Sequence, residues 1–132
     1  MSYRREVESL LGKECMTKLL NHVRNGKMSD DQMRDFVEQL EELSEIDPNV
    51  LLGNHMRRMR RDRDRAPDTE LLEVMYDWWR CSLFEMTQEE AMYVLVRALS
   101  NANCKHLANH LRHASTQQKE FKGTKNVDIE NN

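Results

Sequence analysis

Three amphipathic helical patterns follow one another between Asp68 and His113, and they constrain the fold more than any other part of the sequence. Apolar residues recur there at spacings of three and four, which places them on one face of an α-helix. Each such helix must bury its apolar face against another element, so the stretch predicts a helical bundle. The apolar positions are Leu71, Leu72, Met75, Trp78 and Trp79, then Met92, Leu95, Val96, Ala98 and Leu99, then Cys104, Leu107, Ala108 and Leu111.

The upstream half repeats the same spacing and predicts three more helices. Their patterns cover residues 3–24, 29–43 and 47–59. Gly12 interrupts the first pattern. Because an interior glycine costs a helix about 1 kcal/mol relative to alanine, we expect the first helix to be bent or split at this position.

Composition supports the same fold class, since the 132 residues include only four glycines and two prolines. The sequence predicts an all-α fold, a six-helix antiparallel bundle over residues 1–113. After His113 the pattern stops and the chain becomes polar, so residues 114–132 are expected to form a flexible tail.

Helix-start signals occur at four places. Ser, Thr and Asp side chains can accept a hydrogen bond from the first turn, and a Glu or Gln three residues later can reach back to the cap. Proline is also well accommodated in the first helical turn. The expected starts are Ser29 with Gln32, Asp47 with Pro48, Asp68 or Thr69, and Thr87 with Glu90.

Cysteine usage and hydropathy indicate where the chain resides. Cys15, Cys81 and Cys104 are odd in number and widely spaced, which favours a reducing compartment over a disulfide framework. The first residues lack the apolar core of a signal peptide, and no apolar run approaches the roughly 18 residues of a membrane span. We therefore expect a soluble cytoplasmic protein.

Sequence motifs for catalysis are missing. There is no glycine-rich phosphate loop, nucleophile elbow or HExxH motif, so we expect a protein that is not an enzyme and needs no cofactor. His106, His110 and His113 share a helical face with Cys104 nearby, but no second pair of ligands is spaced for zinc. We therefore expect these histidines to lie on the surface and to bind no metal.

Charge is distributed unevenly, although the formal net charge is only −3. Eight acidic residues and one basic residue lie between Ser29 and Asp47. The end of the next helix reads RRMRRDRDR, in which six arginines outnumber two aspartates. The charged face of the acidic helix carries Asp35, Glu38, Glu41, Glu42 and Glu45.

A charge run alone is often only a solvated helix end. Two opposite patches on one small body, however, favour head-to-tail association between molecules. An alternative is a helical nucleic-acid-associated or transcriptional module that uses the same arginines, although Asp62 and Asp64 interrupt the patch and the chain is acidic. The expected partner-binding residues are Asp31, Asp35, Glu38, Glu42, Glu45, Arg57, Arg58, Arg60 and Arg61.

The last three helices resemble the death-domain superfamily. The resemblance rests on the segments LLEVMYDWW, EEAMYVLVRAL and CKHLANHL. Thr17-Lys18-Leu19-Leu20 and the Met28-Ser29-Asp30 start are also similar to a caspase-recruitment domain, the second subfamily considered. The matching residues are Leu72, Met75 and Trp78 or Trp79, then Leu95 and Leu99, then His106, Leu107 and Ala108.

This resemblance implies a six-helix antiparallel death fold that binds other death-fold proteins homotypically through charged patches. It implies a non-enzymatic adaptor or regulator of apoptotic or innate-immune signalling. The tryptophan pair fits a bundle as well, since adjacent rings point about 100° apart around a helix. One of Trp78 and Trp79 should be buried, and the other should either complete the core or contribute to a partner surface.

Overall fold

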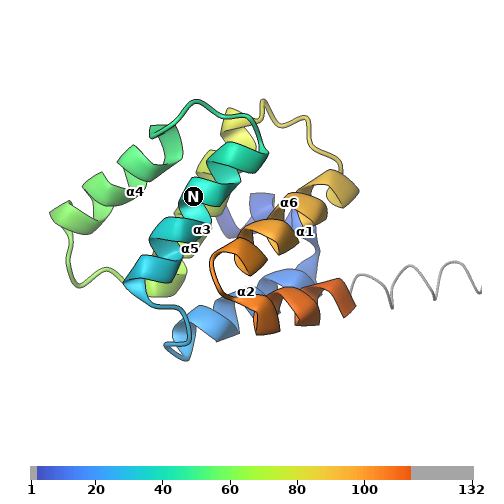
Figure 1. Ribbon diagram of the computed structural model, residues 1–132, viewed down its shortest axis with the longest axis horizontal. Helices are drawn as coiled ribbons and strands as arrows, with labels where there is room; N and C mark the ends of the chain where they lie inside the picture. The colour runs from blue at the N-terminus through green and yellow to red at the C-terminus, as the bar shows by residue number, and fades with distance from the viewer. Residues whose placement is uncertain (1–2, 114–132) are drawn as a thin grey trace, which may run out of the picture.

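The computed structural model describes residues 3–113, which consist of helices and the turns that connect them (Figure 1). This part of the chain contains seven helical segments and no strand, so the predicted all-helical bundle is confirmed. The tail predicted for residues 114–132 lies outside the described residues. The helices are α1 (Tyr3–Leu11), α2 (Lys13–Arg24), α3 (Asp30–Leu43), α4 (Val50–Arg61), α5 (Pro67–Cys81) and α6 (Gln88–Asn101), followed by a last segment over residues 105–113.

Gly12 divides the first expected helix into α1 and α2. Its backbone adopts φ 94° and ψ 151°, a combination that is essentially restricted to glycine. The amide N–H of Gly12 still donates to the carbonyl of Glu8 at 2.8 Å, and its carbonyl accepts from Met16 at 3.1 Å. The chain therefore changes direction at one residue without leaving these two groups unpaired.

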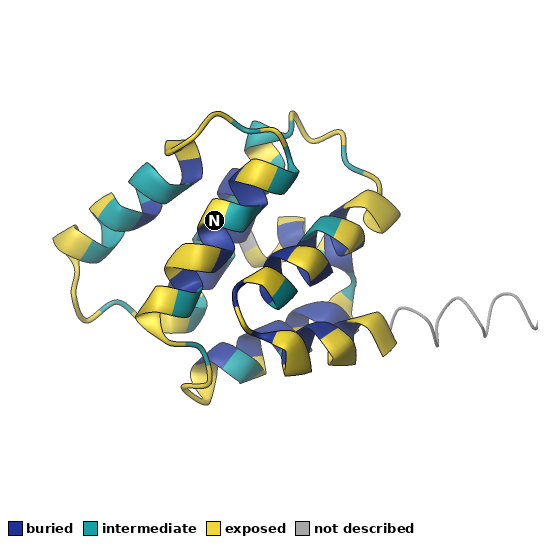
Figure 2. Ribbon diagram, in the orientation of Figure 1, coloured by how far each residue is buried: buried dark blue, intermediate teal, exposed yellow. Residues whose placement is uncertain are grey.

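The core lies where α3, α5 and α6 meet the N-terminal helices. α3 packs against α4, α5 and α6, and α1 packs against α2, α5 and α6. The buried faces of the helices point into the bundle (Figure 2), and Trp78, Phe36 and Met16 are the largest fully buried side chains. Leu107, Ala108 and Leu111 of the last segment join the same core.

Among helices α1 to α6, α4 is the least buried (Figure 2). Only two of its residues, Leu51 and His55, are buried. It contacts α3 and α5. Because so little apolar surface is available, polar contacts must supply much of its attachment.

Two of the expected helix starts are present. At α3 the Ser29 hydroxyl accepts from the Gln32 amide N–H at 3.1 Å, and the Gln32 side chain accepts from the Ser29 amide N–H at 2.9 Å. At α6 the Thr87 hydroxyl accepts from the Glu90 amide N–H at 3.1 Å.

The other two expected starts were wrong. Asp47 and Pro48 precede α4 without opening it; the N-cap is Asn49, in a left-handed conformation with no side-chain capping bond. The cap of α5 is neither Asp68 nor Thr69 but Ala66, and Pro67 occupies the first turn. The side chain that caps α4 comes from α3, as described below.

No helix in residues 3–113 is long and apolar enough to cross a membrane.

Candidate protein-interaction surfaces

The acidic face of α3 is exposed along its whole length. We use the term acidic surface for five exposed carboxylates, Asp31, Asp35, Glu38, Glu42 and Glu45. Within residues 3–113 none of the five takes part in an ion pair, and the Glu42 carboxylate accepts one hydrogen bond, from the Gln39 side chain at 3.2 Å. Their charges are available to a cation from another molecule.

Glu41 does not belong to this surface, although the sequence placed it on the charged face. Its side chain is buried, and Oε2 accepts from the amide N–H groups of Leu51 at 2.7 Å and Leu52 at 3.0 Å. These amides lie in the first turn of α4, where backbone donors have no partner within the helix. A carboxylate from α3 thus caps α4 across the interface between the two helices.

The arginine run divides into an inward-facing and an outward-facing set. Arg58 donates through Nε and Nη2 to the two carboxylate oxygens of Glu70, at 2.8 and 2.9 Å. Its Nη1 donates to Asp77 at 2.9 Å. Arg65, in the turn after α4, donates from Nε to Glu70 at 2.8 Å, and its Nη2 lies 2.7 Å from Glu73. These two arginines therefore join α4 and the following turn to α5.

Glu70 is the centre of this network. It is buried, and its Oε2 also lies 2.6 Å from Nδ1 of the buried His55. Burial alone would raise the pKa of Glu70, but hydrogen bonds from His55 and Arg58 outweigh it and hold the pKa at about 2. Burial likewise opposes the charge on Arg58, yet the bonds to Glu70 and Asp77 raise its pKa above the usual range. Glu70 and Arg58 are therefore both charged throughout the neutral pH range.

The outward-facing set forms the arginine surface, defined here as Arg57, Arg60 and Arg61. All three are exposed. Arg57 donates to the side chain of Asn54 in the preceding turn, and no ion pair within residues 3–113 involves any of the three. Of the four arginines expected to bind a partner, only Arg58 forms ion pairs within residues 3–113.

A methionine-lined pocket of about 270 Å³ opens between the C-terminal half of α4 and the start of α3. Met56 and Met59 of α4 line it together with Met28 and Met33. Methionine side chains are flexible and polarizable, so they can adapt to an apolar contact. The pocket gives this end of α4 an apolar surface next to its charges.

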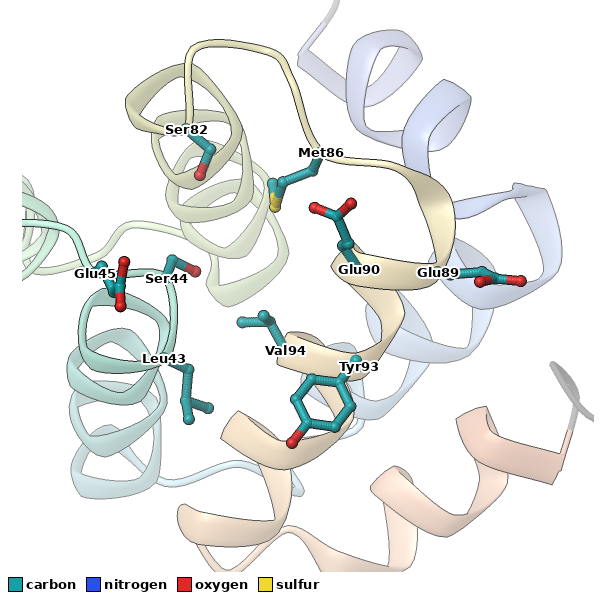
Figure 3. Close-up of a pocket in the computed structure, with 9 residues that line it drawn as sticks. All are labelled: Leu43, Ser44, Glu45, Ser82, Met86, Glu89, Glu90, Tyr93 and Val94. Carbon is teal, nitrogen blue, oxygen red and sulfur yellow. The ribbon is translucent and has the colours of Figure 1, made fainter.

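A second depression lies where the C-terminal ends of α3 and α5 meet the start of α6 (Figure 3). We call it the acidic groove; its volume is about 750 Å³, and its charged lining residues are all acidic. Leu43 and Val94 point toward the interior of the groove, with Tyr93 at one edge and Met86 beside Glu90 at another, while the carboxylate of Glu89 points away (Figure 3). The lining residues are Leu43, Ser44, Glu45, Ser82, Met86, Glu89, Glu90, Tyr93 and Val94.

The tryptophan pair separates as expected into a buried and a peripheral ring. Trp78 is fully buried, and its indole Nε1 donates to the Ser44 hydroxyl at 2.7 Å, which joins α5 to the end of α3. Trp79 is partly buried and packs edge-on against Phe84, with ring centroids 4.9 Å apart. Trp78 is thus a core residue, and Trp79 supports an exposed neighbour.

Cysteines and histidines are placed for packing or solvation. Burial raises the pKa of Cys15 to about 12 and also raises that of Cys104, so neither thiol is a reactive thiolate at neutral pH. The exposed His106 and His110 lie with their Nε2 atoms 3.2 Å apart. Within residues 3–113 no three histidine, cysteine or acidic side chains are grouped to hold a metal ion.

The buried acids Glu41, Glu70 and Asp77 were not recognised from the sequence, although the sequence contains a signal for the two in α5. Glu70 and Asp77 are seven residues apart and share the buried face of α5 with Leu71, Val74 and Trp78. A carboxylate at an apolar position of a helix indicates a buried pairing. The partner, however, could not be identified, because the arginines come from a different helix.

Comparisons of the chain with protein-family models, with curated proteins and with solved structures found no match.

Proposed function

We propose that this protein is a non-enzymatic adaptor or regulator that assembles homotypically, with copies of itself or with similar helical bundles, through the acidic surface and the arginine surface. The observation that carries the proposal is that both surfaces are exposed and have no opposite charge paired with them within residues 3–113. A partner could supply the missing ion pairs, with cations for the acidic surface and carboxylates for the arginine surface. Such contacts raise association rates and fix the orientation of docking.

The two surfaces lie on different parts of the molecule, one along α3 and the other at the C-terminal end of α4 (Figure 1). A contact between unlike surfaces of identical molecules is heterologous, and it leaves one free surface at each end of the assembly. A further copy can then be added at either end. Several charge pairs are needed, because a single exposed ion pair contributes only about 0.2–1 kcal/mol.

Arg58 has a positioning role in this proposal. By pairing with Glu70 and Asp77 it fixes the C-terminal half of α4 on α5. Arg57, Arg60 and Arg61 are therefore presented from a helix whose own position is set by ion pairs. A rigidly held surface loses less conformational entropy when a partner binds.

Death-fold membership and a role in apoptotic or innate-immune signalling are part of the same proposal. Support comes from the resemblance of the α5, α6 and last-segment sequences, and from an all-helical bundle in which these three segments are consecutive. The extra helix produced at Gly12 is a division of the first expected helix, so the order of the other helices is as expected.

Nucleic-acid binding is the competing use of the arginines. Arg58 and Arg65 are already neutralised by Glu70 and Glu73, and the exposed Asp62 and Asp64 adjoin the remaining arginines. A gel-shift assay with random duplex and single-stranded DNA and RNA at physiological ionic strength separates the two functions. We expect no shift, because a phosphate-binding surface needs a continuous positive patch.

Charge reversal tests the proposed function. The variant Arg60→Glu/Arg61→Glu should weaken self-association about tenfold or more, measured by sedimentation velocity over a concentration series at low salt. The matched control is Arg5→Glu/Lys13→Glu, which makes the same change in charge at exposed positions away from both surfaces and should behave as wild type. Equal association of all three proteins, or a wild type that stays monomeric and captures no helical partner, would contradict the proposal.

A further inference from the structure

The turn after α5 exposes two large apolar side chains in the segment between Ser82 and Met86, two residues that line the acidic groove. Leu83 is 72 % exposed and Phe84 is 51 % exposed, and Tyr93 on the groove edge is 61 % exposed. Together they are three of the four large hydrophobic residues that are exposed within residues 3–113. Single exposed apolar residues are ordinary, but several of them on the segments that line one depression mark an interaction site.

The backbone of this turn is strained as well. Leu83 has φ 59° and Phe84 has φ 56°, so two consecutive residues with bulky side chains adopt the left-handed conformation. Glycine normally occupies this position after a helix, because a Cβ atom disfavours the conformation by roughly 1–2 kcal/mol. Leucine at position 83 therefore destabilises the turn, and its exposed side chain gains little burial in return.

Phe84 is held in a defined position despite its exposure. Its amide N–H donates to the carbonyl of Trp79 at 3.2 Å, and its ring meets the Trp79 ring edge-on at an interplanar angle of 88°. The turn thus presents a fixed apolar projection between Ser82 and Met86, two of the residues that line the groove. Because the strained backbone brings little burial of the Leu83 side chain within the molecule, it indicates a role in binding another molecule.

We propose that the acidic groove and the Leu83–Phe84 turn form a docking site for a basic amphipathic helix of a partner protein. Apolar residues of that helix would contact Phe84, Met86 and Val94, and its flanking lysines or arginines would face Glu45 and Glu90. Glu45 and Glu90 line the groove and no basic residue does, which is the charge complement of such a helix. A helix fits better than an added strand, because residues 3–113 contain no sheet edge to extend.

This site differs from the surfaces of the proposed function, since the arginine surface plays no part in it and its main contacts are apolar. Only Glu45 belongs to both. Variants that leave Glu45 unchanged can therefore test the groove independently of charge-driven assembly.

A synthetic peptide provides the test. The probe is a fluorescein-labelled 18-residue helix of leucine and lysine with leucines at helical spacing, and fluorescence anisotropy measures its binding to the full chain. Two companion peptides replace all leucines by alanine or all lysines by glutamate. We expect only the leucine–lysine peptide to bind at up to about 100 µM. Absence of binding, or equal binding of the alanine–lysine peptide, would overturn the proposal.

Variants of the chain locate the contact. Phe84→Ala and Glu90→Lys should each weaken binding of the peptide about tenfold, whereas Glu6→Lys, an exposed change of the same charge on α1, should leave it unchanged. Leu83→Gly should weaken binding while raising the melting temperature, because glycine relieves the strained backbone. A loss of binding through misfolding would instead lower the melting temperature.

Arg60→Glu/Arg61→Glu should bind the peptide as wild type does, so the groove and the proposed function can fail separately. Unchanged binding by Phe84→Ala and Leu83→Gly would overturn the groove proposal. If the same variants still self-associate in sedimentation velocity, the proposed charge-driven assembly is not affected by that result.

Discussion

At the scale of single residues, two buried carboxylates hold α4 in place. Glu41 reaches from α3 to the first turn of α4, and Glu70 reaches from α5 to the side chains of His55, Arg58 and Arg65. Each accepts hydrogen bonds on a charged group, which is stronger than a bond between neutral partners. The position of the arginine surface therefore depends on residues that are not part of it.

Removal of the Glu41 cap should destabilise the protein. Glu41→Ala leaves two amide donors of α4 without a partner, and we expect the free energy of unfolding to fall by about 2 kcal/mol. Glu41→Gln should lose less, because its amide oxygen can still accept. Urea denaturation measures both, with Glu38→Ala as an exposed control on the same helix. If Glu41→Ala loses no more than the control, the cap contributes nothing to stability.

Glu70 should make stability depend on pH in acid. Its pKa is about 2 in the folded protein and near 4.5 when unfolded, so the folded state binds fewer protons between these values. Its contribution is fully present above pH 4.5 and is lost as the pH falls toward 2. We expect Glu70→Gln to cost about 3 kcal/mol at pH 7, and the difference from wild type to shrink between pH 5 and pH 2.

The measurement is a series of urea denaturation curves for the two proteins at pH values from 7 to 2. Parallel stability profiles for wild type and Glu70→Gln would show that this carboxylate does not keep its charge through the network.

At the scale of elements, the direction of the chain between α1 and α2 depends on one glycine. A Cβ atom at Gly12 would lie 3.5 Å from the Gln88 side chain, which is ordinary contact, so space does not require glycine there. The backbone conformation does, since φ is 94°. Gly53 is the opposite case: it lies within α4, has no positive φ, and an added Cβ would only touch Arg57 at 4.0 Å.

The two glycines should respond to alanine with opposite signs. Gly12→Ala should lower the free energy of unfolding by about 2 kcal/mol, because alanine is strained in this conformation. Gly53→Ala should raise it by about 0.5–1 kcal/mol, because alanine favours helix. Thermal or urea unfolding measures both. A stabilising Gly12→Ala would mean that residues 3–24 can form one continuous helix in solution.

The starts of α3 and α6, which neighbouring side chains cap, could be predicted from the sequence, whereas the start of α4 could not. The cap of α3 needs only Ser29 and Gln32, three residues apart, and it was found. The cap of α4 needs Glu41, from another helix, so the local candidates Asp47 and Pro48 gave the wrong start. Pattern reading detects contacts within about one turn, whereas a contact between helices depends on how they pack.

The same limit explains the candidate surfaces. The five residues of the acidic surface, four in α3 and Glu45 just after it, were predicted to bind a partner, and all five are exposed. The arginines could not be divided into internal and external sets, because the division depends on Glu70, Glu73 and Asp77 of α5. The acidic groove was also missed, since it combines the ends of α3 and α5 with the start of α6.

At the scale of the whole molecule, the proposed assembly requires that the acidic surface of one copy meet the arginine surface of the next. Both surfaces are exposed, so their contact should weaken as salt screens the charges. Exchanging the charges gives a sharper test than screening. Asp35→Arg/Glu38→Arg/Glu42→Arg gives the acidic surface a net positive charge, while Arg60→Glu/Arg61→Glu gives the arginine surface a net negative charge.

The most direct measurement is sedimentation velocity of these two variants, alone and in equimolar mixture, at low salt. Each variant alone should be monomeric, because both of its surfaces then carry the same sign. The mixture should assemble, because each altered surface finds its opposite on the other variant. Monomers in the mixture, or assemblies of either variant alone, would contradict docking between the acidic surface and the arginine surface.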